Sequence, residues 1–310
     1  MNVPGRLAAF AAVLALAFGA AALAGAAIGP TGKQHVAHAA HGGGNPQSGH
    51  GGGDPHAGHG AMGAMTGTMA ASGLAVSADG LTLEADRTFL TTGRPAPFRF
   101  RITDARGRVL RDEFQVESAR RLHFIVVRRD TAIYQHLHPT EGRDGTWSVD
   151  LTLPEAGVYR AYADFQIGGR KHVLATDLFA PGDFAPNPLP AASETGQARA
   201  GETQQPTGEQ VSLQDPGLKA GRETMLTFAV TRDGDPVADL QPYLGAKGHL
   251  VALREGDLAY LHVHPDEARL AADQIQFMST FPTAGTYRLF LQFKARGTVR
   301  TVAYTLEVPR

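Results

Sequence analysis

An internal duplication constrains this chain more than any other feature of its sequence. Three segments of the first half recur in the second half. They are LHFIVVR at 122–128 and GHLVALR at 248–254, YQHLHP at 134–139 and YLHVHP at 260–265, and PEAGVYR at 154–160 and PTAGTYR at 282–288. The offset is 126 in the first two pairs and 128 in the third, because the second copy has two more residues after Pro265. Matching segments in one order indicate one structural unit built twice, so each copy must fold in the same way.

Within each copy, short apolar runs alternate with turn residues. In the first copy these runs lie at 98–103, 122–127, 132–137, 147–153, 158–165 and 173–179, with Gly, Pro or Asp between them. Short strands with regular turn signals predict an all-β fold, an antiparallel sandwich or barrel of about 100 residues per copy. We place the two domains at 73–182 and 209–310, and interpret the Pro-, Ala- and Gln-rich stretch 183–208 as a linker. Tyr159 and Tyr287 are interpreted as turn and core residues rather than as chemistry.

Each copy carries a histidine, then twelve intervening residues, then His-x-His-Pro. The candidate metal ligands are His123, His136 and His138 in the first copy and His249, His262 and His264 in the second. Residues two apart on a strand share a face. A tight hairpin centred on Arg129 and Asp130 puts His123 directly opposite His136, where Cβ atoms are ~4.5–5.5 Å apart. The spacing therefore predicts a three-histidine metal site in each domain, with a coordination position left open.

The same face of each hairpin is otherwise apolar. It carries Ile125, Val127 and Tyr134 in the first copy, and Val251, Leu253 and Tyr260 in the second. Such a floor would exclude water from a metal site. Asp164 is a candidate acceptor for an imidazole N–H, and His172 is a weaker candidate ligand. The alternative is that these histidines are half-buried strand residues that bond backbone carbonyls.

The N-terminal region predicts export. Leu7–Ile28 is an uncharged run of 22 residues, which as a helix spans roughly 33 Å and can cross a bilayer. Arg6 in front of it favours an N-terminus in the cytoplasm and the rest of the chain outside. Residues 1–30 are then a membrane anchor, or a signal peptide cleaved near Ala24–Ala26, in which case the protein is secreted.

The stretch 31–72 is rich in glycine and predicts a disordered tail. Its candidate metal ligands are His35, His38, His41, His50, His56, His59, Met62, Met65 and Met69. Imidazole binds copper, zinc and nickel, whereas thioether sulfur favours Cu(I). The pairing of His with Met therefore favours copper as the cofactor, with zinc as the alternative.

Composition excludes several classes of function. The 310 residues include 29 basic and 30 acidic side chains, a net charge of −1, which offers no basic face for nucleic acid. The chain has no cysteine, so disulfides, iron–sulfur clusters, cysteine nucleophiles and blue-copper centres are excluded.

Three motifs of the first copy carry a family resemblance: RLHFIVV at 121–127, QHLHP at 135–139 and YRAYADF at 159–165. With these motifs, the sequence resembles a group of exported, membrane-anchored bacterial proteins described as heavy-metal-binding. That resemblance implies β-sandwich domains of the immunoglobulin-like or cupredoxin-like kind.

From these patterns we expect an extracytoplasmic protein that binds copper and sequesters it or delivers it, with a membrane metal transporter as a candidate partner. Two alternatives stay open. One is a metal-free adhesion or scaffold module. The other is an enzyme with a metal on three histidines, which is disfavoured because no general base stands at a recognisable spacing.

Overall fold

The computed structural model describes residues 72–310, except 201–204, 215–216, 262 and 268–269. The described part is built from strands and turns and contains no helix, so none there could cross a membrane. It forms two tandem all-β domains, and the predicted fold class is confirmed. Leu7–Ile28, the candidate tail ligands from His35 to Met69, and His262 lie outside the described residues.

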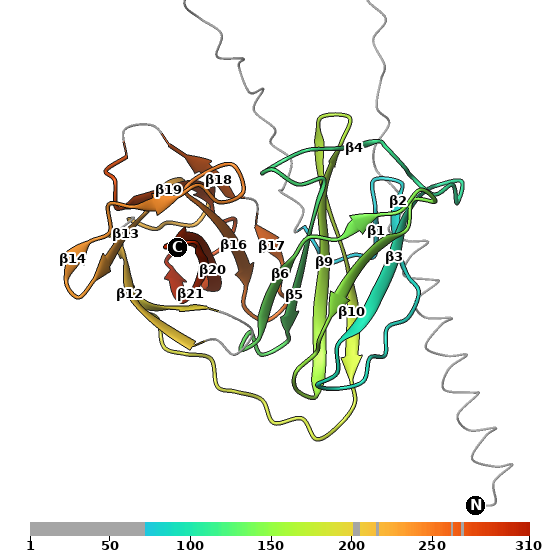
Figure 1. The fold of residues 1–310 in the computed structure, drawn as a ribbon, viewed down its shortest axis with the longest axis horizontal. Coiled ribbons are helices and arrows are strands. Elements are labelled where there is room, and N and C mark those ends of the chain that lie inside the picture. The colour runs from blue at the N-terminus through green and yellow to red at the C-terminus, as the bar shows by residue number, and fades with distance from the viewer. Residues whose placement is uncertain (1–71, 201–204, 215–216, 262, 268–269) are drawn as a thin grey trace, which may run out of the picture. The chain divides into compact units, whose positions relative to one another are not determined.

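The first copy folds into two antiparallel sheets with a shared core (Figure 1). One sheet has the order β1 (Ser77–Ala78), β2 (Leu81–Ala85), β3 (Ala96–Asp104), β8 (Trp147–Leu151) and β7 (Thr140–Glu141). The other has the order β10 (Arg170–Ala180), β9 (Gly157–Ile167), β5 (Leu122–Arg128) and β6 (Tyr134–Leu137), and β4 (Phe114–Gln115) pairs with β9.

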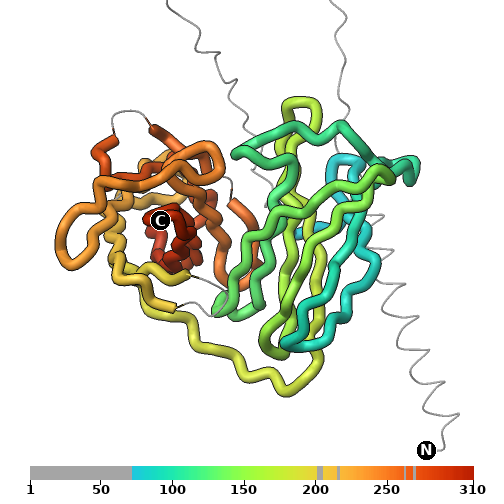
Figure 2. The backbone as a smooth tube through the Cα atoms, in the orientation of Figure 1, coloured from blue at the N-terminus to red at the C-terminus, as the bar shows by residue number. Residues whose placement is uncertain are grey.

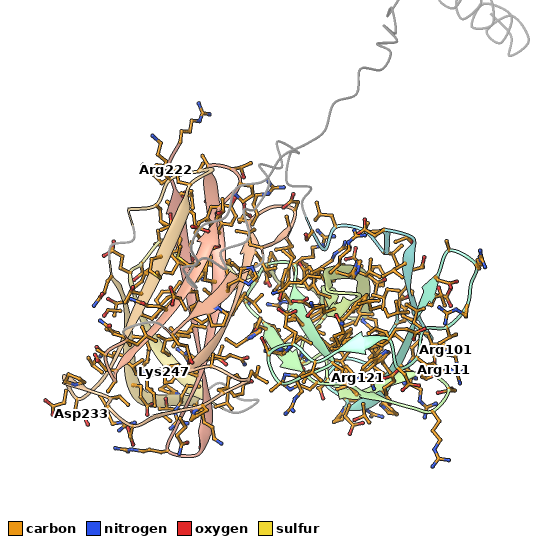
Figure 3. The ribbon with its side chains drawn as sticks, turned by 90° about the horizontal axis from the view of Figure 1, so that it is seen from above. Arg101, Arg111, Arg121, Arg222, Asp233 and Lys247 are labelled. Carbon is orange, nitrogen blue, oxygen red and sulfur yellow. The ribbon has the colours of Figure 1, made fainter. Side chains whose placement is uncertain are left out.

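Alternation of side chains along β3 builds the core between these sheets. Phe98 and Phe100 are fully buried, whereas Arg99 between them is exposed. The rings of both phenylalanines pack on Phe124 of the opposite sheet, with centroids 5.4 and 5.0 Å apart. The charged side chains of the other face, such as Arg101, lie at the outside of the domain (Figure 3). A period of two thus gives one apolar and one polar face, as expected for a sandwich.

The second copy forms one continuous sheet that encloses its core. The strand order is β17 (Tyr260–Leu261), β16 (Gly248–Arg254), β20 (Gly285–Ala295), β21 (Thr298–Val308), β11 (Thr195–Ala200), β12 (Gln205–Gln214), β13 (Glu223–Arg232), β19 (Gln274–Thr280) and β18 (Val263–Asp266). Two short strands lie off this path: β14 (Asp235–Pro236) pairs with β13, and β15 (Leu240–Gln241) with β20. By sequence equivalence, β16 and β20 correspond to β5 and β9.

β11 lies in the stretch that composition assigns to the linker, and it joins the two halves of the second sheet. It pairs with β12 on one side and with β21 at Arg199 and Thr301 on the other. Gly196 permits this position, because a Cβ there would lie 2.4 Å from Cγ1 of Val302. The chain before it, residues 181–194, forms no strand. It is the long yellow-green stretch of tube along the lower edge of Figure 2. Composition does not separate this strand from the linker, since neither has an apolar run.

Tyr159 and Tyr287 have the structural role that the sequence predicts. Both are fully buried, and each hydroxyl donates to a backbone carbonyl four residues earlier, Glu155 O at 2.7 Å and Thr283 O at 2.9 Å. This contact fixes the turn into the central strand of each domain, in the manner of a tyrosine corner.

The two domains pack on each other through the equivalent face of each hairpin. The cluster between them consists of Ile125, Val127, Tyr162, Val173, Ala175, Val251, Leu253, Leu258, Tyr260 and Phe290, with Tyr134 against it. Tyr134 stacks on Phe290 with centroids 4.2 Å apart, and Tyr260 lies 5.4 Å from Tyr162. These two pairs are equivalent when the repeats are exchanged, so the contact has the character of an isologous interface. The predicted apolar floor is therefore the domain interface.

Candidate metal centre

The hairpin between β5 and β6 has a different register from the predicted one. Ile125, not His123, is the Cα partner of His136, and Phe124 pairs with Leu137. The turn is longer than predicted, since the closing bond runs from Arg128 N to Ile133 O at 3.0 Å. Asp130 stabilises it by accepting from Ala132 N at 3.2 Å. The predicted register is thus wrong by two residues. A shift of two leaves every side chain on its original face, so the histidines still converge.

Four imidazoles form one cluster, three from the first domain and one from the second. Within the first domain, the ring centroids are 5.1 Å apart for His123 and His136, 4.8 Å for His136 and His138, and 5.3 Å for His123 and His138. His249 of β16 joins them, with its centroid 5.1 Å from that of His123 and 4.7 Å from that of His136. The structure therefore assembles the first predicted triplet and adds a histidine from the second copy.

The nitrogen atoms are close enough to share a metal ion. One ring nitrogen each from His123, His136 and His249 lies within 4.8 Å of the others. A tetrahedral ion with metal–nitrogen distances of about 2.0–2.1 Å holds its ligand atoms roughly 3.3 Å apart.

The hydrogen bonds of the cluster fix which nitrogen carries each proton. His136 Nδ1 lies 2.8 Å from Oε1 of Gln292, and His123 Nε2 lies 3.1 Å from the carbonyl oxygen of Glu117. Both oxygens are acceptors, so each of these nitrogens must be the donor in a neutral ring. Gln292 Nε2 faces Thr301 Oγ1 at 3.2 Å, which supports this amide orientation.

In these tautomers, two lone pairs point at each other. His123 Nδ1 and His136 Nε2 are 2.9 Å apart, and neither holds a proton when the outer nitrogens do. Two further buried nitrogens, Nε2 of His138 and Nε2 of His249, have no hydrogen-bond partner among the described residues. Close nitrogens of His123, His136 and His249, two of them with facing lone pairs, fit a bound cation.

Burial keeps all four rings neutral. It lowers the pKa of His123, lowers the pKa of His136 well below its usual value, and lowers the pKa of His138 to about 4 and of His249 to about 3. The neighbouring imidazoles lower the pKa values of His136, His138 and His249 further by repulsion between their charged forms. Neutral imidazole is the form that ligates metals, so at neutral pH the four rings are in the protonation state that metal binding requires.

Asp164 lies beside this cluster but bonds a different partner. It is the Cα neighbour of His123 across β5 and β9, and its Oδ2 accepts from the hydroxyl of Tyr260 at 3.0 Å. Burial raises its pKa to about 6. Its carboxylate offers charge compensation for a cation nearby rather than the predicted hydrogen bond to an imidazole.

Two other candidate histidines lie apart from the cluster. β17 ends at Leu261, after which β18 pairs with β19 at the other end of the strand order, where His264 is the Cα partner of Met278. His264 is exposed, with Nδ1 3.4 Å from Nζ of Lys171. His172 stacks on Phe165 and its Nδ1 lies 3.5 Å from Asp79 Oδ2.

Sequence reasoning missed Gln292 and Glu117 as partners of the histidines. Gln292 stands on the apolar central strand β20 at the position equivalent to Asp164 in β9, so each repeat places one polar side chain there. A polar residue in an otherwise apolar central strand was the sequence feature that could have identified Gln292. Glu117 contributes a backbone carbonyl, which no residue type discloses.

Comparison with solved structures finds proteins with distant similarity. The adhesin FdeC of Escherichia coli is 14% identical, with 76% of this chain and 65% of that chain covered and a TM-score of 0.23. Invasin, a bacterial integrin-binding protein, is 14% identical over 76% of this chain and 41% of its own, with a TM-score of 0.22. Salmonella alpha-2-macroglobulin is 13% identical, with 77% of this chain and 15% of that chain covered and a TM-score of 0.26. The chain thus spans less than two thirds of each.

No curated protein sequence matches the chain significantly. One domain family does, described as a domain of unknown function (DUF8832), and it matches twice, at residues 75–181 and 203–310. The two matched segments coincide with the two β domains and, together, with most of the chain. The chain therefore belongs to the DUF8832 family, as a tandem pair of its domains.

Proposed function

We propose that this protein binds a transition-metal ion between its two domains, through His123, His136, His138 and His249. The observation that carries the proposal is that the lone pairs of His123 Nδ1 and His136 Nε2 face each other 2.9 Å apart. The other nitrogen of each ring donates its proton to an oxygen, that of the Glu117 backbone carbonyl for His123 and that of the Gln292 side chain for His136. A proton between these nitrogens is disfavoured because burial lowers the pKa of both rings. A metal cation satisfies both lone pairs at once.

Four imidazoles favour copper(II), zinc or nickel over magnesium or calcium, which prefer oxygen ligands. We propose copper, with zinc as the alternative. If all four rings bind, a four-coordinate ion keeps no open position for substrate, as in structural rather than catalytic sites. This supports holding or handing on the ion rather than catalysis. The uncharged run Leu7–Ile28 supports a location outside the cytoplasm.

The test is metal retention by the full-length chain against a competing chelator. Copper(II) or zinc is loaded, excess is removed with the chelator, and the retained metal is measured by inductively coupled plasma mass spectrometry. We expect the wild type to retain one ion, and His136→Asn and His249→Asn to lose it. His264→Asn is the matched control and should retain the ion. The chelation step removes ions held weakly elsewhere in the chain.

The two variants lie in different domains, so a loss in both identifies a site shared between them. Equal retention by the wild type and both variants would contradict the proposal. In the copper-loaded protein, nitrogen hyperfine splitting in the electron paramagnetic resonance spectrum should report imidazole ligation.

A second candidate function is that of a metal-free adhesion or scaffold module. It is favoured by the apolar contact between the domains and by the bond from His136 to Gln292, which joins the repeats without an ion. In that case the chelator-treated protein should melt at the same temperature as the metal-loaded protein. A metal-dependent rise in melting temperature, lost in His249→Asn, would exclude it.

A further inference from the structure

A cavity of about 730 Å³ lies between β6, the segment before β11, and strands β11, β20 and β21. Its lining includes Tyr134, Ser193, Gln197, Arg288, Phe290 and Thr305. Small-molecule sites commonly have volumes of ~300–1,000 Å³, apolar walls and a few polar groups. This cavity is separate from the histidine cluster and does not depend on the metal proposal.

Arg288 is a buried cation without an anion. It is 5% exposed, and its Nη1 donates to Thr305 Oγ1 at 2.8 Å. Its buried Nε has no acceptor, and no carboxylate of the described residues lies within ion-pair distance. Glu155, which also lines the cavity, is paired with Arg128. Burying a charge without a partner raises the free energy of the folded protein, so an anion bound in the cavity beside Arg288 would stabilise it.

In the first repeat, the equivalent arginine does have an acidic partner. Arg160, the equivalent of Arg288, is paired with Asp177 at 3.0 Å, and Asp177 is its Cα partner across β9 and β10. The equivalent of Asp177 is Thr305, which is likewise the Cα partner of Arg288. The second repeat therefore keeps the arginine and replaces its acid with a hydroxyl, and this arginine lines the cavity.

An aromatic surface adjoins the guanidinium. Phe290 is stacked on Tyr134 at an interplanar angle of 7°, and Cζ of Arg288 lies 5.4 Å from the centroid of Phe290. The free edge of a guanidinium matches a carboxylate or phosphate, which can accept two parallel hydrogen bonds. The apolar part of the lining, which includes Ile133, Pro154 and Ala303, suits a hydrocarbon body behind that head group.

We propose that this cavity binds a small organic anion, with its carboxylate or phosphate group on Arg288 and its apolar part against Phe290. Thr305, Ser193 and Gln197 contribute neutral donors and acceptors around the head group, and the lining also includes the charged side chains of Arg199 and Glu155.

Isothermal titration of the full-length, chelator-treated protein with naphthoate, naphthyl phosphate and the neutral naphthalenemethanol tests this. Chelation removes any contribution of a metal ion. We expect one or both anions to bind at least about tenfold more tightly than the neutral compound, since hydrogen bonds to charged groups are worth about 1.5–3 kcal/mol. The tighter of the two anions identifies the head group. Binding of neither anion, or equal binding of the neutral compound, would overturn the proposal.

Variants locate the binding. Arg288→Gln should weaken anion binding at least about tenfold. Arg222→Gln, on the exposed surface, is the matched control and should leave it unchanged (Figure 3). Ala303→Trp fills the cavity from an exposed position, so it should fold and still block binding. Undiminished binding by Ala303→Trp, or by folded Arg288→Gln, would refute the site.

Discussion

The imidazole rings of His123 and His249 lie nearly parallel, at an interplanar angle of 14°, with their centroids 5.1 Å apart. The two residues hold the same position in the two copies of the repeat. They meet because the equivalent faces of the two hairpins pack together, and this contact brings His249 of the second copy to the triplet of the first. The proposed metal binding at this cluster would therefore depend on the contact between the domains.

Gln292 should act as a positioning residue for His136. Gln292→Leu removes the acceptor for His136 Nδ1–H, so the ring loses the bond that fixes its tautomer and orientation. Loss of such a partner typically costs 10–100-fold in metal affinity, and we expect about tenfold here, measured by chelator competition. Gln276→Leu, whose amide bonds Thr227 away from the cluster, is the control and should have wild-type affinity. Equal affinities in the two variants would remove Gln292 from the site.

The metal-free protein should lose stability between pH 7 and pH 5. Burial lowers the pKa of His249 to about 3, whereas an unfolded histidine titrates near 6.5. Below pH 6.5 the unfolded chain therefore binds more protons than the folded chain, and the free energy of unfolding falls as the pH falls. His249 alone should contribute about 2 kcal/mol of this loss at pH 5.

Urea unfolding at the two pH values, with a chelator present, measures this loss of stability. His249→Asn should show a smaller difference between the two pH values than the wild type. A pH difference as large in the variant as in the wild type would contradict the neutral, buried state of this ring.

The hydroxyl of Tyr162 should stabilise the domain interface. It donates to the carbonyl oxygen of Leu258 in the other repeat at 2.6 Å, so Tyr162→Phe leaves a buried acceptor unpaired. We expect the free energy of unfolding to fall by about 1–3 kcal/mol. Tyr134→Phe is the matched control, because the Tyr134 hydroxyl is buried with no hydrogen-bond partner in the described part of the chain and its removal should be neutral or stabilising. Equal thermal stability of the two variants would argue against the interdomain bond.

Glu209 should be the main acid-sensitive group of the second domain. It is fully buried and accepts from Arg232 Nη2 at 2.6 Å and from Arg300 Nε at 3.1 Å. Although burial alone would raise its pKa, hydrogen bonds from Thr207 and the two arginines lower it to about 2. Because the folded pKa lies below the unfolded value near 4.3, its stabilising contribution is complete above that value and is lost as the pH falls toward 2.

Glu209→Gln leaves two buried arginines without their carboxylate, so at pH 7 we expect a loss of about 3–5 kcal/mol in urea unfolding. Glu307→Gln, at an exposed position bonded to Thr286, should change stability by less than about 0.5 kcal/mol. A small effect of Glu209→Gln would show that the buried ion pairs do not hold this domain together.

Much of the fold follows from the local pattern. Alternation along β3 and the apolar run of β5 predict strands, and the repeat predicts that both copies share them. The common face of His136 and His138 also follows, because a strand has a period of two whatever its partner. The register did not follow, since it depends on the bonds of Asp130 in the turn, and the predicted pairing of His123 with His136 is wrong by two residues.

The sequence by itself determined which side chains share a face, because that depends only on the backbone of one strand. It also determined that two similar domains follow each other, because a repeated pattern needs no partner to be seen. Only the tertiary structure decided that the apolar faces of the hairpins bury each other, that His249 joins the first triplet and that His264 leaves the hairpin with β18. Those outcomes depend on how two separately folded surfaces fit, and that fit is a property of three-dimensional packing that no spacing along one chain encodes.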